Sequence, residues 1–179
     1  ILLAEKNLDW KKHHVNLQEK ENLKPEYLKL NPLGVVPTLV EHGQAVIESS
    51  IICEYLDDAY PEPTLRPADP YQRSTMRYWM KHVDVKLHPS CGTIQWPMVM
   101  REALMSKPEA ERDQLLARIP EKPRRERQMR LVKFGLDAPD VADAVRTYRK
   151  TIVDMEEILT TRQWVASDQF SLADICLAP

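Results

Sequence analysis

The sequence has few cysteines and no long hydrophobic run, and both absences narrow the class of protein. Three cysteines, Cys53, Cys91 and Cys176, occur in 179 residues, with neither a CxxC motif nor the spacing of a zinc site. An odd and small number of cysteines is more typical of a protein in the reducing cytosol than of a fold held by disulfides. No apolar run approaches the about 20 residues of a membrane-spanning helix, and no signal peptide is visible. The sequence therefore predicts a cytoplasmic protein without a membrane segment or a metal site.

Neither sign of charge dominates. Lys and Arg together number 25 and Asp and Glu 27, so the formal net charge is −2. This balance argues against a nucleic-acid-binding protein, which usually carries a basic excess. A hydrophobic content of 43% and a charged content of 29% are typical of a chain that folds around a core.

Hydrophobic periodicity predicts a small α/β unit followed by helices. The expected elements of the first part are the end of a helix at 1–8, a strand at 10–17 with Trp10, Val15 and Leu17 inward, a short helix from Pro25, a hairpin of strands 37–40 and 45–47, and a helix at 49–60. The segment 61–70 holds four prolines and predicts a linker. We place the domain boundary there, with one domain at 1–62 and another at 63–179.

The second part has the pattern of long helices. Asp69 and Pro70 predict a capped start, and Met76, Trp79-Met80, Val83 and Leu87 continue at steps of three and four residues. Pro89 and Pro97 are expected to kink or break this helix. A second long pattern runs from 141 to 159. Ser171 and Asp174 predict a capping box, which is favoured over a catalytic pair.

The stretch 31–56 carries most of the functional information. Pro37 opens an apolar run, so it fits the first position of a strand, and the bond before it could be cis. This geometry would leave the main-chain N–H and C=O of Val36 without a sheet partner. Glu48 and Ser49 would place a carboxylate and a hydroxyl at the start of the next helix. The site would then combine a free peptide edge, a carboxylate and a helix N-terminus.

These residues resemble those of the soluble glutathione transferases over nearly all of the chain. The resemblance rests on Asn31-Pro32-Leu33-Gly34, Val36-Pro37, Glu48-Ser49 with the helix that follows, and the SLADI box at 171–175. It implies a thioredoxin-like N-terminal domain, here without its first strand, and an all-helical C-terminal domain. The stretches ESSIICEYLDDAYPEP and LRPADPYQRSTMRYWMKHVD, and the Arg-rich insert at 118–135, look most like bacterial lignin β-aryl-etherase transferases.

The resemblance assigns roles in binding glutathione, the expected co-substrate. The main chain of Val36 before Pro37 would pair with the cysteinyl residue, Ser49 and the helix N-terminus would hold the γ-glutamyl carboxylate, and Glu48 would take the α-ammonium. Asn22 aligns with a position that binds the glycyl carboxylate in relatives. Structural alternatives remain open: Pro37 could only fix a turn, Glu48-Ser49 could only cap the helix, and Asn22 could only cap a loop.

The second substrate, a small electrophile, would lie against the helical domain. Candidate pocket residues are Trp79, Met80, His88, Cys91 and Trp96, although such residues at helical spacing are more often core. Asp84 could reach across a dimer interface to the γ-glutamyl amine, as a helix-borne Asp does in relatives. The insert from Arg118 would be a solvated loop or a clamp for an anionic substrate.

The resulting hypothesis is a cytoplasmic, homodimeric glutathione S-transferase that serves as a detoxification enzyme or as a glutathione-dependent β-etherase. The resemblance implies that the thiol-activating residue lies at the start of the first helix, and since the chain starts within that helix, this residue would precede Ile1. Because the chain also ends soon after Ser171, we expect a fragment of a longer protein. We expect the fragment to be inactive, since its sheet lacks the first strand. Two alternatives remain: a non-catalytic binding or scaffold module that keeps the fold, and a Cys-type glutathione-dependent reductase or isomerase.

Overall fold

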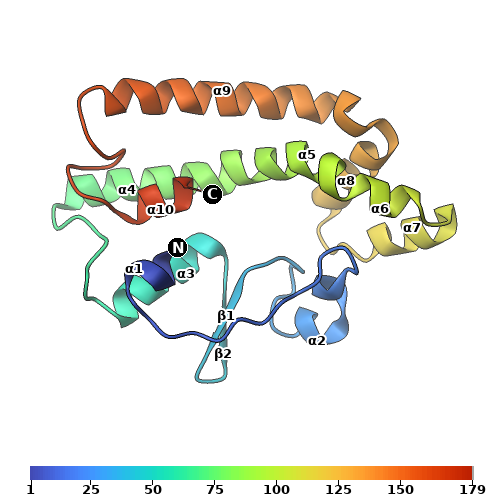
Figure 1. Ribbon diagram of the computed structural model, residues 1–179, viewed down its shortest axis with the longest axis horizontal. Helices are drawn as coiled ribbons and strands as arrows, with labels where there is room; N and C mark the ends of the chain where they lie inside the picture. The colour runs from blue at the N-terminus through green and yellow to red at the C-terminus, as the bar shows by residue number, and fades with distance from the viewer. Residues whose placement is uncertain (179) are drawn as a thin grey trace. The chain divides into compact units, whose positions relative to one another are not determined.

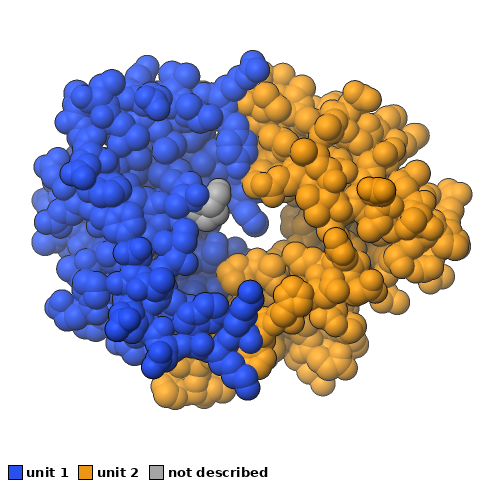
Figure 2. Space-filling view, viewed as in Figure 1, with its two compact units in different colours: residues 1–12, 48–88, 148–179 blue, residues 13–47, 89–147 orange. Residues whose placement is uncertain are grey.

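The computed structural model describes residues 1–178 and divides into two compact units (Figure 2). Unit 1 comprises residues 1–12, 48–88 and the chain from 148 onward, and unit 2 comprises 13–47 and 89–147. Each unit is described by itself below. The units interleave along the chain, so the predicted domain boundary at residue 62 stays a prediction.

Figure 1 shows the helices and strands of the chain. In chain order, short helices come first, a hairpin of two strands follows, and the remaining elements are helical. They are α1 (Leu2–Glu5), η1 (Glu21–Leu23), α2 (Pro25–Leu28), β1 (Thr38–Glu41), β2 (Gln44–Ile47), α3 (Ser49–Ala59), α4 (Pro70–His82), η2 (Val83–Leu87), α5 (His88–Val99), α6 (Arg101–Met105), α7 (Glu109–Ala117), α8 (Lys122–Phe134), η3 (Gly135–Asp137), α9 (Pro139–Leu159) and α10 (Leu172–Leu177). Within the described residues, no helix combines the length and the apolar character that crossing a bilayer requires.

The predicted hairpin is present in unit 2. β1 and β2 pair antiparallel, with Thr38 opposite Ile47 and Glu41 opposite Gln44. His42 and Gly43 form the loop with φ of 50° and 78°, and positive φ at both positions is what a tight two-residue hairpin turn requires. The register therefore ends at Thr38, directly after Pro37.

The predicted strand at 10–17 is wrong. The structure assigns no strand to these residues; of the three side chains expected to face inward, Trp10 and Leu17 are exposed and Val15 is half-buried. A strand needs a neighbour to satisfy its main-chain groups, and the sheet in the described part of the chain consists of β1 and β2. The segment Lys11–His14 is also polar at four consecutive positions, so it offers no apolar face to bury.

Helices of unit 2 enclose a small hydrophobic core. Its buried members come from η1 and from α6 to α8, and Trp96 of α5 packs against them. They are Leu23, Leu104, Leu116, Ile119 and Val132. The Arg-rich insert, expected as a loop or clamp, mostly forms α8, whose Leu131 and Val132 are buried while most of its basic residues are exposed or half-buried.

Unit 1 is built around α4, whose capped start is confirmed because Asp69 accepts a hydrogen bond from the Gln72 N–H at 2.8 Å. The predicted apolar stripe forms its core, with Met76, Trp79 and Met80 buried. The residues of α10 that pack beside α4 are buried as well. Residues 61–69 form the predicted irregular linker.

The two prolines after α4 act differently from each other. A π-helical segment, η2, directly precedes α5, in which Pro89 lies in the first turn. Because proline has no N–H, the carbonyl one turn earlier needs a different partner, and a π turn is one way to rearrange these bonds. Pro97 does not break the helix, since α5 continues through it to Val99.

Candidate functional site

The peptide group of Val36 is the first part of the predicted site. The Val36–Pro37 bond is cis, and Val36 is 37% exposed. Among residues 1–178, its main-chain N–H and C=O have no hydrogen-bond partner, because the ladder begins only at Thr38. This segment therefore offers a main-chain donor and a main-chain acceptor that are not used within the described chain.

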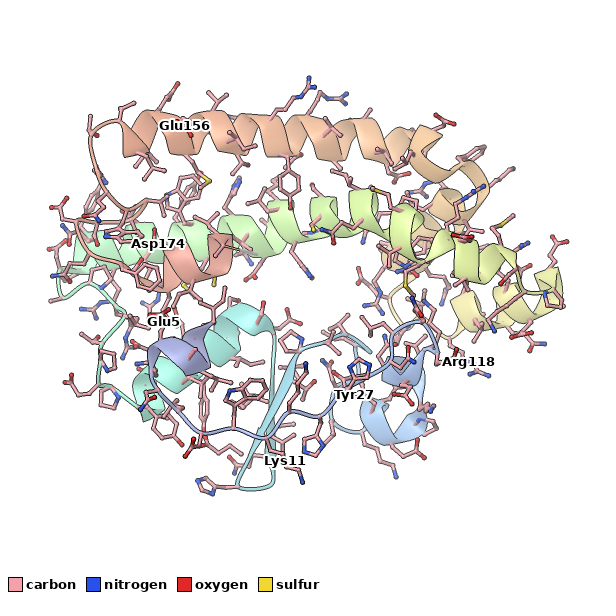
Figure 3. The ribbon with its side chains drawn as sticks, in the orientation of Figure 1. Glu5, Lys11, Tyr27, Arg118, Glu156 and Asp174 are labelled. Atoms are coloured by element: carbon pink, nitrogen blue, oxygen red, sulfur yellow. The ribbon has the colours of Figure 1, made fainter. Side chains whose placement is uncertain are left out.

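Neighbouring side chains hold the residue before this free edge. The Tyr27 hydroxyl, on α2 (labelled in Figure 3), donates to the carbonyl oxygen of Val35 at 2.6 Å. The Asn31 amide donates to the same oxygen at 2.8 Å and is itself fully buried. Because Val35 accepts two hydrogen bonds, the backbone that leads into Val36 is fixed without using any main-chain group of Val36.

Asn22 lies beside the same loop. Its amide nitrogen donates to the carbonyl oxygen of Gly34 at 2.7 Å, which leaves a second amide hydrogen. Gly34 has φ of 60°, and a Cβ at this position would come within 2.8 Å of a Leu23 methyl carbon. The loop thus requires glycine at position 34, and the hydrogen bond from Asn22 to Gly34 stabilises this loop.

Glu48 and Ser49 are both exposed at the start of α3 in unit 1. Glu48 is the N-cap residue, with φ of 69° and ψ of 116°, a conformation that residues other than glycine rarely adopt. Within the described chain neither side chain bonds to the first turn of the helix. The N–H groups of that turn therefore remain available to an anion, so the two residues do not act as a simple helix cap.

Asp84 takes a place that the sequence did not predict. It accepts a hydrogen bond from the Ser50 hydroxyl at 2.6 Å, and both residues belong to unit 1. The sequence predicts that Asp84 reaches across a dimer interface. In the structure its carboxylate lies against the first turn of α3 in its own chain, where its partner Ser50 directly follows Ser49. Only the tertiary fold could reveal this, because 34 residues separate the pair.

The five residues predicted for the second substrate fall in both units. Trp79 and Met80 are buried in α4, and His88 is exposed at the start of α5, all in unit 1. Cys91 and Trp96 are half-buried in the part of α5 that belongs to unit 2. A cleft formed by the whole set stays a prediction.

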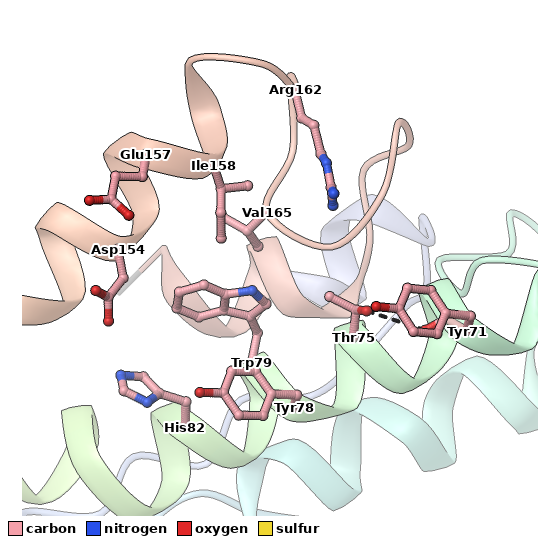
Figure 4. Close-up of a pocket in the computed structure, with 10 residues that line it drawn as sticks. All are labelled: Tyr71, Thr75, Tyr78, Trp79, His82, Asp154, Glu157, Ile158, Arg162 and Val165. Atoms are coloured by element: carbon pink, nitrogen blue, oxygen red, sulfur yellow. Dashed lines mark hydrogen bonds between the residues drawn. The ribbon is translucent and has the colours of Figure 1, made fainter.

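A pocket of about 410 Å³ lies within unit 1 between α4 and the end of α9 (Figure 4). Its lining mixes aromatic and charged side chains: Tyr71, Thr75, Tyr78, Trp79, His82, Asp154, Glu157, Ile158, Arg162 and Val165. His82 is bound to the Thr151 hydroxyl at 2.8 Å, and burial lowers its pKa below the ordinary value. Of the predicted second-substrate residues, Trp79 lines this pocket.

The capping box is confirmed at α10, where Figure 3 labels Asp174. One Asp174 oxygen accepts from both the N–H and the hydroxyl of Ser171 at 2.9 Å, and the other accepts from the Val165 N–H at 3.2 Å. Ser171 is fully buried. These contacts are structural, as the sequence indicated.

Cys53 does not lie alone in its helix. The thiol of Cys176 donates a hydrogen bond that lowers the pKa of Cys53 against the opposing effect of burial. The same interaction, together with burial, raises the pKa of the Cys176 thiol. Both cysteines are half-buried members of unit 1.

Comparisons with known proteins agree with this arrangement. The family described as the glutathione S-transferase N-terminal domain matches residues 1–64. Protein LigF of Sphingobium sp. strain SYK-6 is 31% identical over 97% of this chain and 68% of its own length. The maleylacetoacetate isomerase of Pseudomonas aeruginosa is 42% identical, over 50% of this chain and 43% of its own.

Solved structures share the fold. The crystal structure of the β-etherase LigF superposes with a TM-score of 0.88 at 31% identity, covering 98% of this chain and 73% of that chain. A glutathione transferase of Populus trichocarpa has a TM-score of 0.71 at 21% identity, over 99% of this chain and 72% of that one. The predicted fold class, a thioredoxin-like part followed by a helical part, is confirmed.

The chain belongs to the glutathione S-transferase family. Glutathione, the co-substrate predicted from the sequence, is the co-substrate that gives this family its name.

Proposed function

We propose that the protein transfers glutathione to an electrophilic carbon, and that the peptide edge at Val36 is where glutathione docks. The observation that carries this proposal is the free N–H and C=O of Val36 before Pro37. An extended cysteinyl residue can satisfy both groups at once, as an added antiparallel strand. The main chain supplies this recognition, so it needs little of the Val36 side chain.

The γ-glutamyl end of glutathione would be held at the start of α3. Its carboxylate would accept from the Ser49 hydroxyl and the free N–H groups of the first turn, where the helix dipole favours an anion. Glu48 would take the α-ammonium, and its unusual backbone conformation fits a site where strain is retained for function. Chain continuity supports this, because Glu48 directly follows Ile47, the residue paired with Thr38. Asn22 would offer its second amide hydrogen to the glycyl carboxylate.

The reaction would begin with the thiolate of glutathione, since the thiolate is the nucleophile. A thiol with a pKa of about 8.5 needs a hydrogen-bond donor to be ionised at neutral pH, and this activating residue stays unassigned. The thiolate would attack the carbon that bears an aryl ether, forming a C–S bond while the C–O bond breaks and phenolate leaves. The similarity to LigF, whose solved structure is that of a β-etherase, supports an aryl ether as the substrate.

The second substrate would contact Trp79, Met80, His88, Cys91 and Trp96. The protein would act as a cytoplasmic homodimer, with Asp84 supporting the first turn of α3 from within the same chain. The similarity to an isomerase spans half of this chain, so it does not decide the choice of reaction.

Binding of glutathione to purified protein by calorimetry tests the docking site. Val36→Ala should leave the dissociation constant within about twofold, since the main chain does the binding, whereas Val36→Pro removes the N–H and should weaken binding about tenfold. Ser49→Ala should also weaken it by about tenfold. Thermal unfolding of each free variant checks that the fold is retained. Equal binding by Val36→Pro and wild type would refute the docking mode.

The choice of substrate is tested separately. Release of phenol from a β-aryl-ether compound is measured beside conjugation of a halogenated arene. Conjugation of the arene without phenol release would exclude the etherase and keep the transferase. Glutathione binding without either reaction would instead favour the non-catalytic binding module.

A further inference from the structure

Among the described residues of unit 2, Lys20 is buried and Arg124 is half-buried, and neither forms an ion pair. Lys20 is only 7% exposed, and its ammonium lies 5.7 Å from the centre of the Trp96 ring. Among the described residues, no carboxylate comes within 4.0 Å of Lys20 or of Arg124. Lysine is almost never buried to this degree unless it is paired.

Arg124, on α8, brings the second charge. One terminal nitrogen donates to the carbonyl oxygen of Leu33 at 2.9 Å, which fixes the guanidinium beside the loop that leads to Val36. Its Nε is buried and has no acceptor in the described chain. One helical turn further along α8, the amide oxygen of Gln128 is likewise buried without a partner. Two buried polar atoms on successive turns of α8 thus lack the contacts that buried polar groups normally make.

The electrostatics agree with this geometry. Burial lowers the pKa of Lys20, and the nearby positive charge of Arg124 lowers it further. Burial also lowers the pKa of Arg124. Two like charges that are partly removed from water are unfavourable in a folded protein, and the charge of Glu121 offsets the lowering of the Arg124 pKa only in part. The contact of Lys20 with Trp96 is a weak attraction and does not replace a counter-ion.

We propose that Lys20 and Arg124, with the Trp96 ring as one wall, form a binding subsite for the carboxylate of a small ligand. A carboxylate can accept from the free Nε–H of a guanidinium and from an ammonium at the same time, in short charge-assisted hydrogen bonds. The carboxylate belongs either to the glycyl end of glutathione, in which case this inference rests on the proposed function, or to an acidic aromatic second substrate.

Paired ligands that differ only in the carboxylate distinguish the two sources. Calorimetry compares glutathione with its glycyl monoethyl ester, and an aryl-ether carboxylic acid with its methyl ester, in a carboxylate-free buffer of low ionic strength. Wild type should prefer the acid over the ester by about tenfold or more in one pair, and that pair identifies the source. Lys20→Met and Arg124→Met should abolish this preference.

Two exposed lysines provide matched controls. Lys24→Met removes a charge four residues after Lys20, and Lys122→Met removes one near Arg124 on the same helix; both side chains are mostly exposed. These variants should keep the preference. Without ligand, Lys20→Met should unfold at a higher temperature than wild type, because an unpaired buried charge is gone.

The inference is overturned if wild type binds acid and ester equally in both pairs, or if Lys20→Met and Arg124→Met keep the preference. Failure of the proposed function has a different signature. Glutathione and its ester would then both fail to bind, while the aromatic pair would still report on the subsite.

Discussion

The environment of the His82 side chain makes the stability of the fold depend on pH. It bonds to the Thr151 hydroxyl at 2.8 Å and lies edge-on to Trp79, with ring centres 5.5 Å apart. Burial lowers its pKa, and the charges of Lys86 and Lys150 lower it further against an opposing effect of Asp154. The folded state therefore holds the proton of this group less tightly than the unfolded state does.

We predict that this histidine destabilises the fold in acid. As pH falls through the ordinary histidine value of 6.5, the unfolded state takes up the proton first, so the free energy of unfolding decreases. His82→Gln, which can keep the bond to Thr151, should lose less stability than wild type between pH 7.5 and 5.5. Urea unfolding at three pH values measures this, with the exposed His88→Gln as control. Parallel pH profiles for wild type and His82→Gln would refute the assignment.

At the scale of elements, the start of α10 depends on a few polar contacts more than on intrinsic helix propensity. The helix has six residues, too few to be stable alone. Its capping box satisfies the first turn, and the Leu172 N–H bonds to the Leu65 carbonyl at 3.0 Å, which attaches the helix to the linker. Burial of Leu172, Ala173 and Ile175 supplies the rest.

We expect substitutions of the two capping-box residues, Ser171 and Asp174, to lower the free energy of unfolding by different amounts. Ser171→Ala should lower the free energy of unfolding by about 1–2 kcal/mol, the usual loss for an N-cap. Asp174→Ala should lower it by about 2–4 kcal/mol, because the buried N–H groups of Ser171 and Val165 also lose an acceptor. Urea unfolding measures both. The exposed Asp168→Ala, from the same loop, should be near neutral; equal effects for Asp168 and Asp174 would contradict this account.

At the scale of the whole molecule, a buried ion pair connects three segments of unit 1. The Lys6 ammonium lies 2.7 Å from an Asp57 oxygen, and both side chains are fully buried. Lys6 also donates to the carbonyls of Tyr60 and Pro63 at 2.7 Å, and Asp57 accepts from the Leu65 N–H at 3.0 Å. Arg66 lies 2.7 Å from the other Asp57 oxygen, without hydrogen-bond geometry. The network joins α1, α3 and the linker.

Asp57→Ala should therefore lower the free energy of unfolding by about 3–5 kcal/mol, because it leaves the Lys6 charge buried and unpaired. The double variant Lys6→Met with Asp57→Leu should recover much of this loss, since neither charge then remains. Asp58→Ala is a matched control: its carboxylate also pairs with Arg66 but is mostly exposed, so the loss should stay below about 1 kcal/mol. Equal losses for Asp57 and Asp58 in urea unfolding would argue against the buried pair.

The sequence determined those features that depend on residues close together in the chain. The hairpin around His42-Gly43, the capped start of α4, the proline linker and the Ser171 box follow from local backbone preferences, so each could be predicted. The break before Thr38, and with it the free peptide edge of Val36, follows from proline chemistry in the same way. The strand expected at 10–17 failed because a strand depends on a neighbour that its own sequence does not specify.

Only the tertiary structure decided which distant side chains meet. The pairing of Lys6 with Asp57, the bond from Ser50 to Asp84 and the approach of Lys20 to Trp96 and Arg124 join residues far apart in sequence. Charge and burial at such places are set by packing, since a lysine carries the same local signal whether it lies in solvent or against a tryptophan. The periodicity of the chain therefore predicts its helices, while the energetics of its buried charges emerge only when those helices are packed.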